Sequence, residues 1–185
     1  MAAPGSGKGK ALDMAYIALF AVLIAVCARI CIPSPVPFTL QTFGVFAAVG
    51  VLGGKRGTLA VGLYLLMGAV GLPVFSGFSG GLGWLLGGTG GYIVGFLFAA
   101  LTVWAMEKLP GKKDWMTALS MVLGLLVCYS FGTAWFLLVY AKTTGSVGLW
   151  TALAWCVFPY VIPDLAKIAL ALAVRRRLAA AIRMG

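Results

Sequence analysis

The stretch "FPYVIPDLAKIALALAVRRR" (residues 158–177) combines a long apolar segment, two internal charges and an arginine cluster. Apart from Asp164 and Lys167, its residues up to Val174 are apolar, which predicts a transmembrane helix at about residues 159–175. The arginines that follow mark the cytoplasmic interface, because basic residues concentrate on that side of membrane helices. An apolar run bordered by basic residues recurs along the chain and decides the fold class.

Apolar runs of comparable length give six predicted spans, at about 14–32, 38–54, 57–74, 89–106, 116–140 and 159–175. Hydrophobic residues make up 62% of the 185-residue chain, and the mean hydropathy is +1.06. Charged residues make up 10%, against roughly 25% in soluble proteins. We therefore predict an all-α integral membrane protein with six transmembrane helices. A flexible tail (1–11) precedes the six-helix domain (12–178), and a second tail (179–185) follows it.

The basic residues predict the orientation of these helices. They gather before the first span, in alternate loops and after the sixth span: Lys8, Lys10, Lys55, Arg56, Lys108, Lys112, Lys113, Arg175, Arg176, Arg177 and Arg183. The other connections hold only Arg29 and Lys142. The positive-inside rule then places both termini in the cytoplasm, and the net charge of +10 follows from topology. The first apolar run resembles a signal peptide, but five further spans favour an uncleaved helix.

The amino-acid composition excludes most kinds of metal-binding and catalytic site. The chain has no histidine and four acidic residues, and its four cysteines lack CxxC spacing, so we expect no metal site. Catalytic triads, paired carboxylates and a Walker A motif are also missing, so we expect neither an enzyme nor a bound cofactor. Nucleic-acid binding is not expected, because no basic soluble surface exists.

A proline-rich segment, "CIPSPVPFTLQTFG" (residues 31–44), follows the first predicted span and lies on the outer side of the membrane in the predicted topology. Its three prolines disfavour helix and favour an extended course. The segment is either a stiff connector or part of a ligand site, and from its sequence both remain open. Phe38, Thr39 and Gln41 would supply the apolar and amide groups that ligand sites use.

A glycine-rich segment, "GLPVFSGFSGGLGWLLGGTGGYIVGF" (residues 71–96), follows on the same side. Gly87, Gly91 and Gly95 are spaced four apart, which predicts close helix packing. Irregular backbone at membrane depth is tolerated only when it is buried in protein or lines a cavity. We therefore expect irregular outer loops that cap a ligand cavity in the helix bundle.

Asp164 and Lys167 are charged residues within an apolar segment, where a charge is energetically costly. Pro163 is expected to begin the helix, which would place Asp164 in the first turn, where the helix dipole favours a carboxylate. Lys167, three residues on, shares its face. The pair is either a structural ion pair or a ligand site. Ligand recognition is favoured, because intramembrane ionisable groups are usually functional.

Small residues form one stripe on the first predicted helix, with Ala21 and Ala25 at its centre, one turn apart. Such a face permits tight helix contact. The pattern fits internal packing and a partner protein equally well.

Three motifs together resemble one family. "PFTLQTFGVF", "GLPVF" with "GGLGWLLGGTGGYIVGF", and "FPYVIPDLAK" are similar to BioY, the biotin-specific S component of energy-coupling-factor (ECF) transporters. The resemblance runs from about residue 12 to 178. It implies a biotin-binding membrane subunit in a bacterial or archaeal cell membrane, energised by an ECF T component and two ABC-type ATPase subunits.

The resemblance also implies roles for individual residues. Asp164 would accept hydrogen bonds from the ureido N–H groups of biotin, and Lys167 would donate to the ureido carbonyl or orient the carboxylate. The other implied ligand contacts are the polar Tyr92, Ser79 and Gln41 and the apolar Phe38, Phe75 and Trp84. Ala21 and Ala25 match the small-residue pattern that S components use against the T component.

Two other functions remain as alternatives. The shared S-component fold allows another vitamin, such as thiamine, although a cationic vitamin would favour a lone acid over an acid–lysine pair. A membrane scaffold with a structural Asp164–Lys167 pair would bind no ligand at all.

Overall fold

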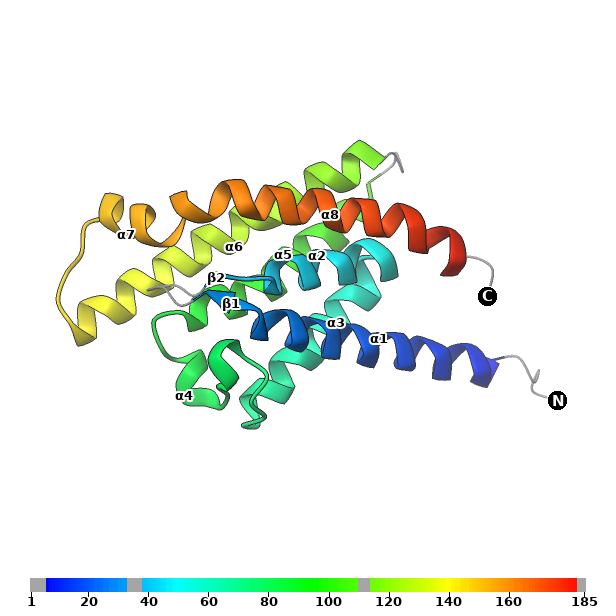
Figure 1. Ribbon diagram of the computed structural model, residues 1–185, viewed down its shortest axis with the longest axis horizontal. Helices are drawn as coiled ribbons and strands as arrows, with labels where there is room; N and C mark the ends of the chain where they lie inside the picture. Colours follow the sequence, from blue (N-terminus) through cyan, green and yellow to red (C-terminus); the bar gives the residue numbers. More distant parts are fainter. Residues whose placement is uncertain (1–5, 33–37, 110–113, 183–185) are drawn as a thin grey trace.

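The computed structural model describes residues 6–32, 38–109 and 114–182. Within these ranges most residues are helical (Figure 1). The elements are α1 (Ser6–Arg29), β1 (Cys31–Ile32), β2 (Phe38–Thr39), α2 (Gln41–Leu52), α3 (Gly54–Ala69), the 3-10 turn η1 (Ser76–Phe78), α4 (Leu82–Leu85), α5 (Gly90–Glu107), α6 (Asp114–Thr143), α7 (Leu149–Cys156) and α8 (Phe158–Ile182).

Each of the six predicted spans overlaps one of the main helices, so the all-helical class is confirmed. Among the described residues, α1, α5 and α6 each contain a stretch long and apolar enough to cross a bilayer. A fourth arises if α7 and α8, which meet at a bend of 41°, count as one span. The 12 residues of α2 extend only about 18 Å at 1.5 Å per residue, less than a bilayer core of about 30 Å.

The short helix α2 lies at the centre of the bundle. It packs against α1, α3, α5 and α8, and almost all of its residues are buried. Its sequence, "QTFGVFAAVGVL", is apolar on every side, as expected for a helix surrounded by protein. The polar residues Gln41 and Thr42 occur only in its first turn, which the packing carries into the interior of the molecule.

Charged contacts gather at the end of the molecule where α1 begins and α8 ends (Figure 1). Arg56 pairs with Asp13 at 2.8 Å, and Arg175 pairs with Asp114 at 2.9 Å. The Glu107 carboxylate accepts a 2.6 Å hydrogen bond from the backbone N–H of Gly54, at the start of α3. Arg56 and Arg175, two of the basic residues that the sequence assigns to the cytoplasm, therefore lie at this end, and α4, α7 and the α6–α7 connection lie at the opposite end.

Glycines bring α5 and α6 into close contact. A Cβ atom on Gly91 would overlap the Trp135 side chain, and one on Gly95 would meet Cys128. The packing role predicted for these two glycines is therefore confirmed. Gly87 lies before α5, and its carbonyl accepts a 3.0 Å hydrogen bond from the Trp135 indole.

The small-residue stripe of α1 faces the interior of the same chain. Ala21 is fully buried, Ala25 is almost so, and both belong to the main apolar core. Helix α1 packs against α2 and α3, and the backbone of Gly44 in α2 approaches Ile24 between the two alanines. A partner protein could reach neither alanine without separating α1 from the bundle, so the packing alternative accounts for the stripe.

The contact at Gly95 gives a stability prediction. In Gly95→Ala the new Cβ would lie 2.9 Å from the Cys128 sulfur and 3.1 Å from its carbonyl oxygen. We expect a loss of about 1–3 kcal/mol from this overpacking, seen as a lower melting temperature of the detergent-purified protein. Gly62→Ala is the matched control, because a Cβ on Gly62 of α3 meets nothing within 4 Å. Equal melting temperatures for the two variants would contradict the packing argument.

Candidate functional site

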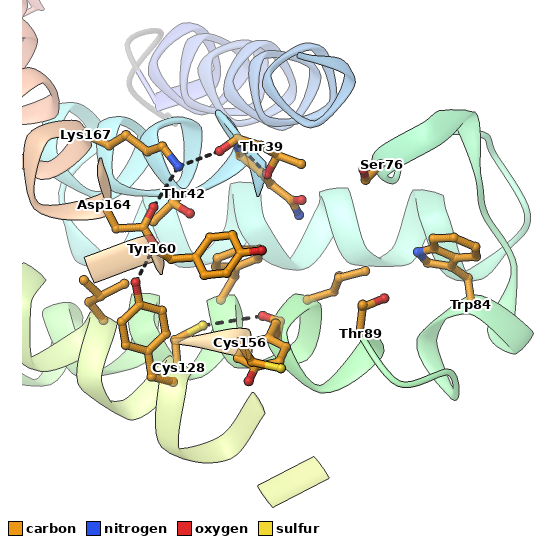
Figure 2. A pocket seen from close by; sticks show the side chains of 16 residues that line it. Thr39, Thr42, Ser76, Trp84, Thr89, Cys128, Cys156, Tyr160, Asp164 and Lys167 are labelled. Atoms are coloured by element: carbon orange, nitrogen blue, oxygen red, sulfur yellow. Dashed lines mark hydrogen bonds and ion pairs between the residues drawn. The ribbon is translucent and has the colours of Figure 1, made fainter. Parts of the chain in front are cut away.

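A cavity opens among α2, α5, α6, α7 and α8 (Figure 2). Its lining includes residues of α4 and α7, which lie away from the charged end of the molecule (Figure 1). The cavity contains about 650 Å³ of empty space, including the part open to solvent. Its lining residues are Thr39, Gln41, Thr42, Ser76, Trp84, Thr89, Tyr92, Ile93, Phe96, Leu125, Cys128, Tyr129, Cys156, Tyr160, Asp164 and Lys167.

The Asp164–Lys167 pair lies at one end of this cavity and is almost completely buried. Lys167 Nζ lies 2.7 Å from Asp164 Oδ1 and donates a second bond, of 2.6 Å, to the backbone carbonyl of Thr39. The Tyr129 hydroxyl donates to Asp164 Oδ2 at 2.6 Å. Such bonds matter because a buried charge left without partners would cost several kcal/mol. The carboxylate still has free acceptor positions, since an ionised carboxylate offers about four.

The expected helix start at Pro163 is wrong. Helix α8 begins at Phe158, directly after a break at Val157, and Pro163 lies inside it. Pro159 already occupies the first turn, so the helix begins earlier than predicted. Asp164 is therefore outside the first turn, and side-chain donors replace the helix dipole as its stabilising contacts. The shared face of Asp164 and Lys167 is confirmed by their ion pair.

The proline-rich segment (residues 31–44) also contributes to the site, through its described residues Phe38 and Thr39. Thr39 supplies its carbonyl to Lys167, and the Phe38 ring lies 4.2 Å from Lys167 Nζ, as a cation–π contact. Phe38 also stacks on Tyr160, with ring centroids 6.0 Å apart. Phe38 thus covers the lysine instead of lining the cavity. Pro33, Pro35 and Pro37 lie outside the described residues.

Gln41 lines the cavity with a fixed orientation. The Tyr64 hydroxyl donates its one proton to the carbonyl of Val74 at 3.3 Å, so it must accept in its 2.9 Å contact with Gln41. Gln41 therefore uses its NH₂ group toward Tyr64. Its carbonyl oxygen has no partner among the described residues and remains an acceptor.

Tyr92 lines the cavity from α5. Its hydroxyl shares a 3.0 Å hydrogen bond with Thr133 of α6. Its ring lies directly against Gly132, where any side chain would overlap it. The close α5–α6 contact therefore fixes where this aromatic ring stands.

The glycine-rich segment sends only some of its predicted residues to the cavity. Trp84 lines it, whereas Ser79 and Phe75 do not. Phe75 is fully buried between Gly68 and the edge of the Tyr64 ring, so it anchors the loop. The Ser79 hydroxyl donates to the carbonyl of Ser76 at 2.6 Å and shapes the turn that presents Ser76. For these two residues, ligand contact stays a prediction without a supporting contact.

Several lining residues had no signal in the sequence analysis. Tyr129 is one polar group within the long apolar helix α6, and its partner Asp164 is 35 residues away along the chain. Thr89, Cys128, Cys156 and Tyr160 likewise look like ordinary loop or helix residues. Only helix packing brings them to the cavity. Among the described residues, no cluster of histidine, cysteine or acidic side chains could hold a metal ion.

Comparison with known proteins gives a consistent result. The family model described as "BioY family" matches residues 5–184. The chain is 40% identical to "Probable biotin transporter BioY" of Pyrococcus horikoshii, covering 91% of this chain and 97% of the relative. It is 37% identical to "Biotin transporter BioY" of Rhodobacter capsulatus, covering 90% and 93%.

A solved structure shares the fold. It is the S-component for biotin from an ECF-type ABC transporter, with a TM-score of 0.81, 28% sequence identity and 93% of both chains covered. The resemblance seen in three sequence motifs is thus confirmed over almost the full length, and this transporter family agrees with the expectation of a non-enzyme. The chain belongs to the BioY family.

Proposed function

We propose that this chain is the biotin-binding membrane subunit of a biotin uptake system. The observation that carries the proposal is Asp164, a buried carboxylate that lines the cavity and keeps free acceptor positions beside Lys167 and Tyr129. Membership of the BioY family and the names of its relatives support biotin as the ligand.

The polar groups of the cavity match the ureido ring of biotin. This ring has two N–H donors on opposite sides and one carbonyl acceptor, so one carboxylate cannot bind both N–H groups. Asp164 accepts one N–H, and the free carbonyl oxygen of Gln41 accepts the other. Two of the three Lys167 N–H groups are engaged by Asp164 and Thr39, which leaves the third for the ureido carbonyl.

The remaining lining suits the apolar part of the ligand. Ile93, Phe96, Leu125 and Tyr160 surround the cavity with apolar and aromatic surface. The thioether ring of biotin packs against this surface, and its burial favours binding at about 25 cal/mol per Å² of apolar area. A cationic vitamin such as thiamine fits less well, because Lys167 already neutralises the single acid among the described lining residues.

We also propose that six helices, α1, α2, α3, α5, α6 and α8, make up the membrane domain, with both termini cytoplasmic. Large apolar side chains on the outer faces of the long helices support contact with lipid: Leu19, Val22, Val26, Leu66, Leu126 and Leu170 are exposed. The ligand cavity then faces the outside, because it lies away from the basic end. The tails at 1–11 and 179–185 are cytoplasmic, although α1 already begins at Ser6.

Energy for uptake comes from other subunits in this proposal. The sequence has no Walker A motif, so an ECF T component and two ABC-type ATPase subunits would hydrolyse ATP for it. The protein needs no cofactor of its own, since the biotin is cargo. Its place is a bacterial or archaeal cell membrane, in keeping with the sources of its relatives.

Titration of the purified protein with biotin, thiamine and riboflavin tests the function directly. We expect saturable binding of biotin, with a calorimetric signal of one site, and none of the other two vitamins. Saturation by thiamine alone would identify a different vitamin as cargo. The absence of any saturable ligand would favour the scaffold alternative.

Removing the charge of Asp164 should weaken binding. In Asp164→Asn the amide accepts more weakly than a carboxylate and leaves Lys167 without its counter-charge. We expect at least a tenfold loss of biotin affinity by calorimetry, about 1.4 kcal/mol or more. Asp114→Asn is the control, because Asp114 is exposed at the opposite end and pairs with Arg175. Unchanged affinity in a folded Asp164→Asn protein would refute the site assignment.

Tyr129 should act through Asp164. Tyr129→Phe removes only the hydroxyl that donates to Asp164 Oδ2, and hydrogen bonds to charged groups contribute about 1.5–3 kcal/mol. We expect roughly a tenfold weaker biotin affinity. Tyr140→Phe is a matched control on the same helix, because the Tyr140 hydroxyl has no hydrogen-bond partner among the described residues. The Tyr140 ring packs against Phe136 and Trp155, and the substitution keeps these contacts. The same affinity in both variants would rule out this role.

A further inference from the structure

A second hollow lies at the charged end of the molecule and shares no lining residue with the ligand cavity. It is formed by the first turns of α1, the junction of α2 and α3, and the end of α5. We call it the α1–α3 groove, because four residues between Lys10 and Ile17 line it from α1, and residues between Gly54 and Leu59 line it from α3. It contains about 1060 Å³ of empty space, including the part open to solvent. In Figure 1 the first turns of α1 project past α2 and α3.

The walls of the α1–α3 groove change from basic to apolar along α1. Lys10, Met14 and Ile17 line it from successive turns of that helix, and Leu59 lines it from α3. Met14 and Leu59 are exposed although they are large and apolar. Lys10 and Ile17 are seven residues apart, which is about 10 Å along a helix. The groove therefore passes from charged to apolar over little more than the depth of the polar interface of a bilayer, roughly 5–8 Å on each side.

The length of α1 places this change at the membrane surface. Its apolar stretch, Gly9–Arg29, is 21 residues long, so it extends about 30 Å, the thickness of a bilayer core. Lys10 then lies at the level of the lipid headgroups. Met14 and Ile17 lie deeper, at the level of the acyl chains.

The charges of the groove leave two ammonium groups without a counter-ion. Its basic side chains outnumber its acidic ones three to two. Both acids are engaged: Asp13 pairs with Arg56 at 2.8 Å, and Glu107 accepts a 2.6 Å hydrogen bond from the backbone at the start of α3. Lys10 and Lys55 form no ion pair or hydrogen bond with any described residue. An anionic group would meet two free lysines here, whereas a cationic group would be repelled by them.

We propose that the α1–α3 groove binds an anionic phospholipid of the cytoplasmic leaflet, with its phosphate between Lys10 and Lys55 and the start of an acyl chain along Met14, Ile17 and Leu59. Basic pockets between membrane helices on the cytoplasmic side are suited to anionic headgroups. The occupant is a lipid, because the apolar wall continues from the lysines into the bilayer. This inference rests on the proposed membrane topology and goes beyond biotin binding.

The test measures the melting temperature of the full-length protein in detergent during titration with dioleoylphosphatidylglycerol. This lipid should raise the melting temperature saturably, because a ligand that binds only the folded state stabilises it. Dioleoylphosphatidylcholine has the same chains and a headgroup without net charge, so it should stabilise the protein less. Glycerol 1-phosphate has the phosphate without the chains and should not stabilise it.

Variants locate the lipid in the groove. Lys10→Gln and Lys55→Gln should each weaken phosphatidylglycerol binding about fivefold, the contribution expected of one basic residue near anionic lipid. Lys108→Gln is the matched control and should have little effect, because Lys108 is exposed at the same end but lies outside the groove lining. Met14→Ser keeps the charges and should weaken both lipids alike. Biotin affinity should be unchanged in all four variants, which shows that they are folded.

Several outcomes would overturn the lipid site. Equal stabilisation by the two lipids, or equal weakening by Lys108→Gln and the two groove variants, would indicate diffuse attraction to the surface. Stabilisation by glycerol 1-phosphate as well would indicate a site for soluble anions. If Lys10→Gln and Lys55→Gln instead abolish co-purification with a T component, without any lipid preference in the wild type, the groove belongs to a protein partner. A wild-type protein that binds phosphatidylglycerol but no biotin would refute only the proposed function.

Discussion

A carboxylate and an ammonium group in the interior of an apolar helix bundle persist only when nearby groups replace the water they have lost. In this protein Asp164 and Lys167 have that replacement, since the Tyr129 hydroxyl, the Thr39 carbonyl and the Phe38 ring surround the pair. These partners come from two other elements, α6 and β2. The pair therefore requires α8, α6 and the segment before α2 to be in their observed places.

The same requirement explains how the rest of the bundle is built. Helix α2 is buried on all sides, so its polar first turn reaches the interior instead of a surface. Glycines on α5 and α6 let these helices approach closely, which sets Tyr92 on one helix and Tyr129 on the other around one cavity.

Whether a polar side chain offers the cavity a donor or an acceptor depends on its neighbours as well as on its residue type. Tyr64 makes Gln41 present its carbonyl oxygen, and Tyr129 and Lys167 leave Asp164 with free acceptor positions. Asp164 and Gln41 thus both present acceptors to the cavity.

The apolar runs could be predicted from sequence because membrane helices need long hydrophobic segments whatever their neighbours. The same reading found Asp164 and Lys167, since charges in such segments stand out. It placed the start of α8 wrongly at Pro163, because two prolines four residues apart both suit a first turn. It also could not choose between a partner surface and internal packing for Ala21 and Ala25.

By itself, the sequence determined the helical class, the basic end of the molecule, the family motifs and the charged pair, because hydropathy, charge and short motifs are local properties. The tertiary structure alone decided which other side chains meet that pair. Tyr129 is ordinary in sequence and acquires its role by contact, through a hydrogen bond and packing between residues far apart in the chain.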